Sequence, residues 1–240
     1  MEEKVVVLIT GKKRAGKSTL ASKLTLAFSD LGLDVAKLSY ANFLKKIMRE
    51  LGVDKYHITK RKYKNFEDFY KTLKEVLIRR LYAYKDLLEK VLEREKESLK
   101  EIYEEYFEKK NKNYGYRKLA QILGTEILRS VKEEIHVEKL LEKLTNIIHF
   151  VDVVIIDDYR FPNEDLKEIL KDEENVKVVR IKVEANDLEE DELSNHASER
   201  EVDKLKVDMV VKRKAYSEEF YIDIKELVKK IIEGGEKWKV

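Results

Sequence analysis

The residues best suited to chemistry lie near the start of the chain, in a glycine-rich stretch with the pattern G-x-x-x-x-G-K-[ST]. In such a stretch the glycines let backbone N–H groups turn toward a polyphosphate, and the N-terminus of a following helix adds partial positive charge. The lysine reaches the outer phosphates of a nucleoside triphosphate, and the hydroxyl holds Mg²⁺. We therefore expect ATP and Mg²⁺ to bind at nine positions: Gly11, Lys12, Lys13, Arg14, Ala15, Gly16, Lys17, Ser18 and Thr19.

The segments on either side of this stretch support the same prediction. Val5–Ile9 is a short apolar run of the kind that forms buried strands, and apolar residues from Leu20 to Phe28 recur at helical spacing. A strand, a glycine loop and a helix in this order place Lys17 at the outer phosphates and Ser18 on the metal ion. The alternative is a chance match in an ordinary strand-turn-helix, and the two flanks argue against it.

Two carboxylates and an arginine form a second candidate group. The apolar run Val153–Ile156 predicts a buried strand, and Asp157 and Asp158 follow it. An acid at the end of a strand beside the phosphate loop can hold a water on Mg²⁺ or orient the attacking group. We expect Asp157 or Asp158 to help Ser18 hold the metal. Arg160 should face the same crevice, where a guanidinium group can grip a phosphate with two hydrogen bonds.

A polar stripe on a predicted helix forms the third candidate group. Its members recur every four residues and are Arg117, Gln121, Thr125 and Arg129. Residues at this spacing are neighbours on a helix surface. A glycine inside a helix costs about 1 kcal/mol against alanine, so Gly124 indicates that something approaches closely there. A nucleotide base or sugar is one candidate, and a helix crossing that needs a small residue is the other.

The rest of the chain alternates between predicted strands and helices. Further strands are expected at 35–39, 176–183 and 209–211, and further helices at 42–51, 117–133, 136–149, 163–170 and 217–233. This alternation predicts an α/β fold in which helices cover both faces of a parallel sheet, with ligands at the carboxyl ends of the strands. With the glycine loop after the first strand, the expected architecture is that of P-loop nucleoside triphosphatases.

A long charged segment interrupts this alternation. From 66 to 110 neither glycine nor proline occurs, and apolar residues recur at helical spacing, so we expect one or two long helices followed by a break at 111–115. The segment could be a lid, part of the acceptor site, a dimerisation arm or a solvated arm. We divide the chain into a P-loop core, residues 1–53 and 115–240, and a helical insertion, residues 54–114.

Composition excludes several classes of protein. The chain of 240 residues has no cysteine, so disulfides and thiolate metal sites are ruled out. Its charged residues make up 41% of the chain but leave a net charge of only +2, which argues against a nucleic-acid binder. No apolar run approaches the ~18 residues of a membrane span. No signal peptide is visible before the first strand, so we expect a cytoplasmic protein.

The composition of polar residues favours a protein adapted to high temperature. The chain is rich in Lys and Glu and contains a single glutamine. Such a composition is typical of hyperthermophile proteins. A composition bias of the source lineage is the alternative explanation.

Four segments together resemble the phage-type deoxynucleoside monophosphate kinases, a family of P-loop kinases. The phosphate loop is common to many families, whereas the R-x-x-x-Q-x-x-G-T-E and D-x-R-F-P-N-E elements are far more specific. The resemblance spans about half the chain. The segments are 11–19, Tyr40–Lys45, Arg117–Glu126 with Arg129, and Asp158–Glu164, and a later element, His196–Glu199, is similar to that family's His-x-Ser-Glu.

The chain also departs from that family's pattern. Ser18 stands where the family often has Asp, Asn42 replaces a frequent Asp, and Asp157 adds an acid. The expected lid, residues 184–199, contains no arginine, although such kinases usually bring lid arginines to the transferring phosphate. Arg14, Arg160 or Arg200 would then have to serve.

The resemblance and the residues imply an ATP- and Mg²⁺-dependent transfer of a phosphoryl group to a (deoxy)nucleoside monophosphate. In this reading Arg160 and Arg129 grip the acceptor phosphate or the transition state, and Gln121 and Thr125 face the base or sugar. Arg117 belongs to the same acceptor set. A P-loop kinase for phosphomevalonate or dephospho-coenzyme A is one alternative. A non-catalytic nucleotide-binding regulatory protein is another. A homodimer through the helical insertion is possible.

Overall fold

The computed structural model describes residues 3–54, 63–109, 111–186, 201–214, 217–233 and 238–239. The chain divides into two compact units, residues 1–40 with 140–240 and residues 41–139. The first unit contains the sheet and the second is helical, and each is described by itself. The predicted insertion, residues 54–114, falls entirely within the range of the helical unit.

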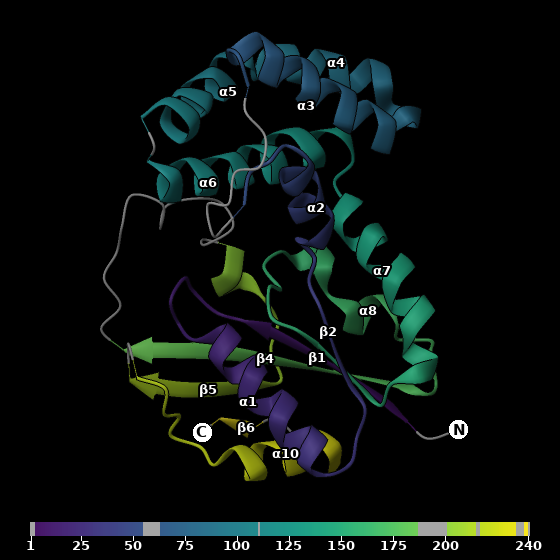
Figure 1. The fold of residues 1–240 in the computed structure, drawn as a ribbon. Coiled ribbons are helices and arrows are strands. Elements are labelled where there is room, and N and C mark those ends of the chain that lie inside the picture. Colours follow the sequence, from purple (N-terminus) through teal and green to yellow (C-terminus); the bar gives the residue numbers. More distant parts are fainter. Residues whose placement is uncertain are drawn as a thin grey trace. The chain divides into compact units, whose positions relative to one another are not determined.

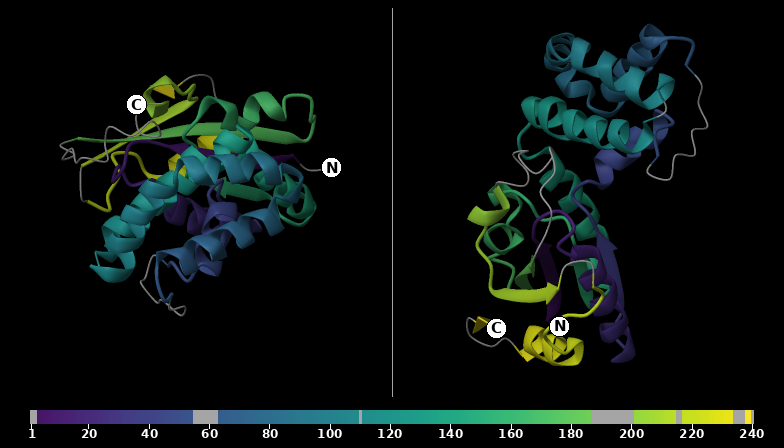
Figure 2. Two further views of the ribbon diagram at one scale, coloured as in Figure 1. Left: turned by 90° about the horizontal axis from the view of Figure 1, so that it is seen from above. Right: turned by 90° about the vertical axis from the view of Figure 1, so that its left-hand side faces the viewer.

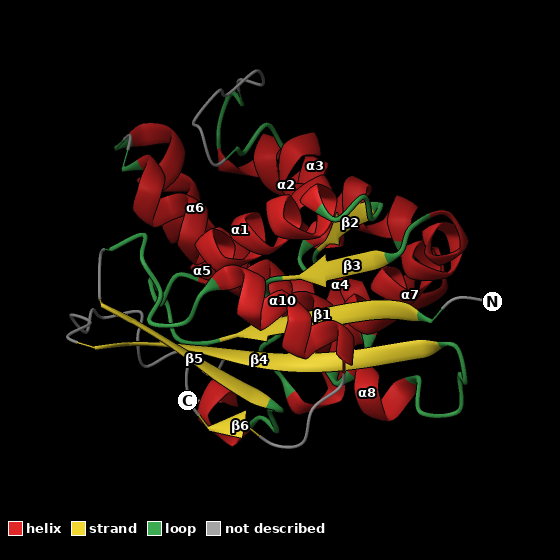
Figure 3. Ribbon diagram, turned by 90° about the horizontal axis from the view of Figure 1, so that it is seen from below, coloured by secondary structure: helices red, strands yellow, loops and turns green. Residues whose placement is uncertain are grey.

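The sheet confirms the α/β prediction. Five parallel strands lie in the order β2-β3-β1-β4-β5, and the two-residue strand β6 continues the sheet beyond β5 (Figures 1 and 3). The strand bounds are β1 (Lys4–Thr10), β2 (Val35–Leu38), β3 (Val153–Ile156), β4 (Val176–Asn186), β5 (Met209–Lys214) and β6 (Trp238–Lys239).

The central strand explains why its sequence is a continuous apolar run. β1 pairs with β3 on one side and with β4 on the other, and Val6–Ile9 are fully buried. A strand covered on both faces has no solvent side on which to place polar residues. Leu8 lies opposite Ile156 of β3 and Arg180 of β4. The carboxyl ends of the three strands therefore meet at one edge of the sheet.

Helices cover the sheet on both faces. On one face α1 (Lys17–Asp30) and α10 (Ile224–Glu233) pack against alternate residues of the strands (Figure 3). On the other face α8 (Leu166–Ile169) packs against β4. The core under α1 and α10 is formed by Val5, Val7, Ile9, Leu20, Leu24, Phe28, Val153, Ile155, Val179, Ile181, Leu227 and Ile231.

Two helix boundaries differ from the sequence prediction. The last helix, α10, begins at Ile224 rather than at Ser217, because the Asp223 carboxylate caps it by accepting the N–H groups of Lys225 and Glu226 at 2.8 and 3.2 Å. The helix predicted at 163–170 is reduced to a 3₁₀ turn over Pro162–Glu164 followed by the short α8.

The helical unit contains a bundle of shorter helices instead of one or two long ones. Phe69, Leu73 and Leu77 are buried as the periodicity predicts, but the chain turns at Leu81 and again at Glu95. After the turn at Leu81, α4 runs back along α3, and α5 follows α4 after the single residue Glu95 (Figure 2). The bounds are α2 (Asn42–Glu50), α3 (Phe66–Arg80), α4 (Lys85–Arg94), α5 (Lys96–Tyr103), α6 (Lys112–Gln121) and α7 (Ile135–Ile147), which runs on into the sheet unit.

A break occurs near the predicted position, but it ends at Asn111 and does not extend to Gly115. Helix α6 begins at Lys112, so Gly115 lies inside it and is buried. A Cβ on Gly115 would lie 2.7 Å from Cβ of Tyr106, in the π-helical segment Glu104–Glu108 that packs against α6. The glycine permits a close crossing of two helices, and for that reason it does not end one.

No helix in the described parts of the chain combines the length and the apolar character needed to cross a bilayer.

A buried ionic network fixes the start of α8 to the sheet. The guanidinium group of Arg180 on β4 pairs with Asp165 at 2.7 Å and with Asp208, just before β5, at 2.9 Å. Asp208 also accepts the backbone N–H of Arg180 at 2.9 Å, and Lys167 pairs with it at 2.9 Å. Burial alone would raise the pKa of Asp208, but the hydrogen bonds from Arg180 outweigh it and hold the pKa below its usual value.

We predict that this network makes stability depend on pH. Because the folded-state pKa of Asp208 is depressed, its carboxylate stabilises the fold above the unfolded pKa of about 3.9, and this contribution is lost as the pH falls through the folded value. Asp208→Asn should lower the free energy of unfolding by about 2 kcal/mol at pH 7 and by much less near pH 3. Urea denaturation at both pH values measures this. Glu174→Gln, at an exposed position, is the control, and a gap that does not change with pH would contradict the prediction.

Candidate functional site

The glycine-rich loop, residues 11–16, connects β1 to α1 in a conformation that few residues adopt. Gly11 has φ 141° and Gly16 has φ 101°. Arg14 has φ 63°, and it is the one non-glycine residue with positive φ in the described parts of the chain. Backbone in the left-handed region is strained for residues with a side chain and is concentrated at functional sites. The strained backbone at Arg14 therefore makes this loop a candidate functional site.

Both glycines also lie close against their neighbours. A Cβ on Gly11 would overlap the carbonyl oxygen of Val183 on β4 and lie 3.3 Å from its carbonyl carbon. A Cβ on Gly16 would overlap the guanidinium group of Arg213 and lie 2.7 Å from its Cζ. The loop therefore packs against β4 and β5. At Gly11 the overlap is with backbone, so only glycine fits there, whereas at Gly16 the positive φ is the stronger reason for glycine.

The loop presents positive potential at the start of α1. Gly16 is the N-cap residue and has no side chain with which to accept the first N–H groups of the helix, and the first turn contains no acid. The Lys17 ammonium group donates to the carbonyls of Gly11 and Lys12 at 2.7 and 2.8 Å, so it lies across the loop. Uncapped N–H groups, a helix N-terminus and a lysine together form a site for a phosphate anion. The Ser18 side chain, in the same turn, is exposed.

The two carboxylates after β3 have different surroundings. Asp158 accepts the Ser39 hydroxyl at 2.6 Å on one oxygen and the Tyr40 N–H at 2.9 Å on the other. It thus fastens the end of β2 to the end of β3. Asp157 makes no hydrogen bond or ion pair with another residue in the described ranges. By strand alternation Asp157 is on the face covered by α1 and Asp158 on the other.

Hydrogen bonds of Glu164 and Tyr40 connect the loop that carries Arg160 to the sheet. The buried Glu164 carboxylate accepts the backbone N–H groups of Arg160 and Phe161 at 2.8 and 3.1 Å. The Tyr40 hydroxyl donates to the Glu164 carbonyl. Burial, with the nearby carboxylates of Glu164 and Asp158, raises the pKa of Tyr40 well above its ordinary value, so the phenol stays protonated and remains a donor. Glu164 therefore positions the backbone of Arg160 beside the sheet edge.

The predicted polar stripe lies in the helical unit. Arg117 is exposed on α6, and Gln121, at its last residue, is half-buried. Thr125 and Arg129 are half-buried in a π-helical segment, Ile122–Arg129, which replaces the regular helix expected there. Nη1 of Arg129 donates to the Glu133 carbonyl at 3.2 Å. π-helical turns are rare and frequently occur at functional sites.

Gly124 has a structural explanation. A Cβ there would lie 3.1 Å from Cδ2 of Leu44 on α2, and Nε2 of His136 lies 3.1 Å from the Gly124 carbonyl. Its close neighbour is thus a leucine of a crossing helix. The interpretation that this glycine makes room for a base or sugar is corrected to helix packing.

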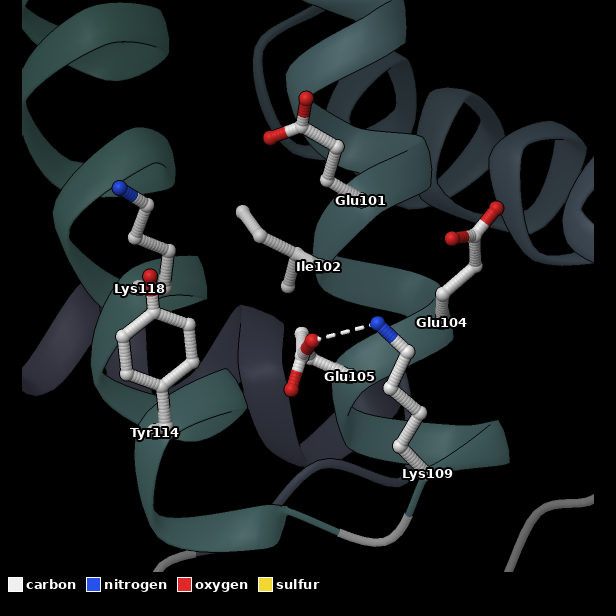
Figure 4. A pocket seen from close by; sticks show the side chains of 7 residues that line it. All are labelled: Glu101, Ile102, Glu104, Glu105, Lys109, Tyr114 and Lys118. Carbon is white, nitrogen blue, oxygen red and sulfur yellow. Dashed lines mark hydrogen bonds and ion pairs between the residues drawn. The ribbon is translucent and has the colours of Figure 1, made fainter.

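A hollow of about 240 Å³ in the helical unit is a poor candidate for a phosphate ligand. Figure 4 shows it between α6, which contributes Tyr114 and Lys118, and the end of α5 with the segment that follows. Three glutamates face two lysines there, and Glu105 pairs with Lys109 at 2.8 Å. None of the predicted site residues lines this hollow.

Several predicted residues lie outside the described part of the chain. These are the His196–Glu199 element, Arg200 and residues 187–199 of the expected lid. Where the description resumes, Asp203 pairs with Lys12 of the loop at 3.3 Å and with Lys182 of β4 at 3.2 Å. Burial would raise the pKa of Asp203, but hydrogen bonds from the two lysines lower it. The chain that follows the expected lid is therefore anchored beside the phosphate loop.

Sequence reasoning missed Arg213, which lies against Gly16 at the end of β5. A signal was present, because β5 alternates and Met209 and Val211 are buried on one face. Arg213 continues that face, and it is only 5% exposed. A cation in the buried register of a strand, at the edge where parallel sheets bind ligands, could have been noticed.

Comparison with family models and with characterised proteins finds no match for this chain. The order of the parallel strands, with the glycine loop after the central strand, is compatible with a P-loop NTPase-like fold.

We predict that Gly11 is far less tolerant of a side chain than Gly32. Both have positive φ, but a Cβ on Gly32 meets no heavy atom within 4 Å. Gly32→Ala should cost about 1 kcal/mol of backbone strain, and Gly11→Ala should cost at least about 2 kcal/mol more because of the overlap with Val183. Chemical denaturation of the two variants measures the difference, and equal losses would show that the loop does not pack as described.

Proposed function

We propose that the protein is a kinase that transfers the γ-phosphoryl group of ATP, with Mg²⁺, to a (deoxy)nucleoside monophosphate. The observation that carries the proposal is the loop of residues 11–16, with its uncapped helix N-terminus and Lys17 lying across it at the carboxyl edge of a parallel sheet. The nature of the acceptor rests on the resemblance of the R-x-x-x-Q-x-x-G-T-E and D-x-R-F-P-N-E elements. The absence of a family match leaves the acceptor to experiment.

The roles in this proposal follow from charge and position. Lys17 and the loop amides neutralise the outer phosphates as charge shifts during transfer. Ser18 is one magnesium ligand, and Asp157 is the better placed of the two acids to assist, because both oxygens of Asp158 are already engaged by the end of β2. A magnesium ion in a kinase needs only one or two side-chain oxygens, since phosphates and waters complete its shell.

Arginines complete the proposed machinery. Arg160 grips the acceptor phosphate from a loop whose backbone Glu164 holds in place. Arg14 is exposed on the phosphate loop itself and can supply the charge that lid arginines supply in related kinases. For four residues of the helical unit, the resemblance alone implies a role in acceptor binding: Arg117, Gln121, Thr125 and Arg129. This chemistry needs alignment and spread-out positive charge more than a general base.

We predict that Lys17→Ala abolishes phosphoryl transfer and leaves the fold intact. The measurement is ADP formation from ATP and Mg²⁺ with a panel of nucleoside monophosphates in ribo and deoxy forms. kcat should fall at least about 100-fold, as for loss of other preorganised donors. Lys171→Ala, which removes an exposed lysine elsewhere, should retain full activity. Circular dichroism should show both variants folded.

The panel also separates the alternatives. Turnover with phosphomevalonate or dephospho-coenzyme A but with no nucleotide would reassign the acceptor. ATP binding without transfer to any acceptor would leave a nucleotide-binding regulatory protein. Wild-type turnover by Lys17→Ala would end the kinase proposal.

A further inference from the structure

Arg213 is a buried cation placed directly on the phosphate loop. It lies at the carboxyl end of β5, is 5% exposed, and packs its guanidinium group onto Gly16, the N-cap of α1. Its Cζ lies 5.6 Å from the centroid of the Phe220 ring, and an isolated backbone bridge links the same two residues. The side chain is thus held in one place by packing on two sides.

The charge of Arg213 lacks a carboxylate partner in the described parts of the chain. Its one hydrogen bond there runs from Nε to the Lys214 carbonyl at 3.3 Å. The contrast is with Arg180, a similarly buried arginine of the neighbouring strand, whose guanidinium is paired with Asp165 and Asp208. Burying a charge without a partner is strongly unfavourable, so a guanidinium group in this condition indicates that an anion binds beside it.

We propose that Arg213 binds the phosphates of the donor nucleoside triphosphate. This inference rests on the proposed function and names a residue of the same site. The guanidinium contacts Gly16, where the N–H groups of the first turn of α1 lack a side-chain cap, so both act on one anion. Arginine suits this task because its planar group binds phosphate oxygens with two parallel hydrogen bonds.

The role of Arg213 also predicts on which side of the phosphate loop the donor and the acceptor bind. In the sheet, β5 and β4 lie on one side of β1, and β3 lies on the other. Arg213 approaches the loop from the β5 side, whereas Asp157 and Arg160 follow β3. The donor is therefore held between the loop and the β5 edge, and the acceptor phosphate reaches the γ-phosphoryl from the β3 edge. Because Arg213 is fixed by packing before the ligand arrives, little side-chain entropy is lost on binding.

The test measures binding and free-state stability in the same variants. Arg213→Met keeps the length and packing of the side chain, and Arg213→Lys keeps the charge. Lys212→Met, at the exposed neighbouring position of β5, is the matched control. Isothermal titration calorimetry with Mg²⁺-ADP and with inorganic tripolyphosphate gives Kd. We expect Arg213→Met to raise both Kd values at least about tenfold, as for loss of a charged hydrogen bond, Arg213→Lys to recover part of this, and Lys212→Met to stay within about twofold of wild type.

Thermal melting of the free variants distinguishes ligand binding from a structural role. Arg213→Met should melt at or above the wild-type temperature, because it removes a buried charge that has no carboxylate partner among the described residues. Unchanged Kd values, with or without a lower melting temperature, would overturn the inference. A loss for ADP with none for tripolyphosphate would also overturn it, since Arg213 would then contact the nucleoside.

The inference and the proposed function fail in different ways. If the wild type binds neither probe, both are overturned. If it binds both probes with the expected loss in Arg213→Met but phosphorylates no acceptor, the kinase proposal falls and the role of Arg213 stands.

Discussion

The structure of the site depends on how closely three strand ends approach one loop. Gly11 lies against the backbone of Val183, where there is no space for a Cβ, and Gly16 lies against the side chain of Arg213. With both ends of the loop fixed, the chain between them must turn through positive φ at Arg14. The same turn brings the loop into α1 without a capping side chain. Such a helix N-terminus is suited to binding an anion.

A second set of contacts holds the opposite side of the loop. Asp158 joins the ends of β2 and β3, and the Tyr40 hydroxyl joins β2 to the loop that carries Arg160. Tyr159 adds a backbone hydrogen bond to Ile9 at 3.3 Å, just before the phosphate loop begins. These groups are engaged in building the edge of the sheet. Asp157, by contrast, takes no part in these contacts among the described residues.

Local patterns predicted β1 and β3 well because each is a short apolar run with its own boundaries. The run Val153–Ile156 and the glycine loop after β1 were both visible without any tertiary information. The different surroundings of Asp157 and Asp158 could not be predicted, because Asp158 is bound by Ser39, which is 119 residues away in the chain. The start of α10 was misplaced because Ser217 and Asp223 are both good caps, and only packing decides between them.

Glycine and arginine are the residue types whose roles were hardest to predict from the sequence. Gly115 was predicted to belong to a break, and Gly124 to make room either for a ligand or for a helix crossing. Each lies where another helical segment crosses, at Tyr106 and Leu44. Sequence alone cannot tell a glycine that ends a helix from one that lets two helices meet, because the partner is remote. Arg213 and Arg180 likewise look alike in sequence. Only the structure shows that one is paired with acids and the other rests on the phosphate loop.

The claim that residues 11–16 form an anion site can be tested on the backbone itself. The chain has eight glycines, so protein labelled with ¹⁵N-glycine gives a sparse amide spectrum that can be titrated with inorganic tripolyphosphate. The account predicts large, saturable shifts for Gly11 and Gly16, with Gly32 and Gly115 unmoved. Saturable shifts confined to other glycines, or no shifts for Gly11 and Gly16 at millimolar tripolyphosphate, would contradict it.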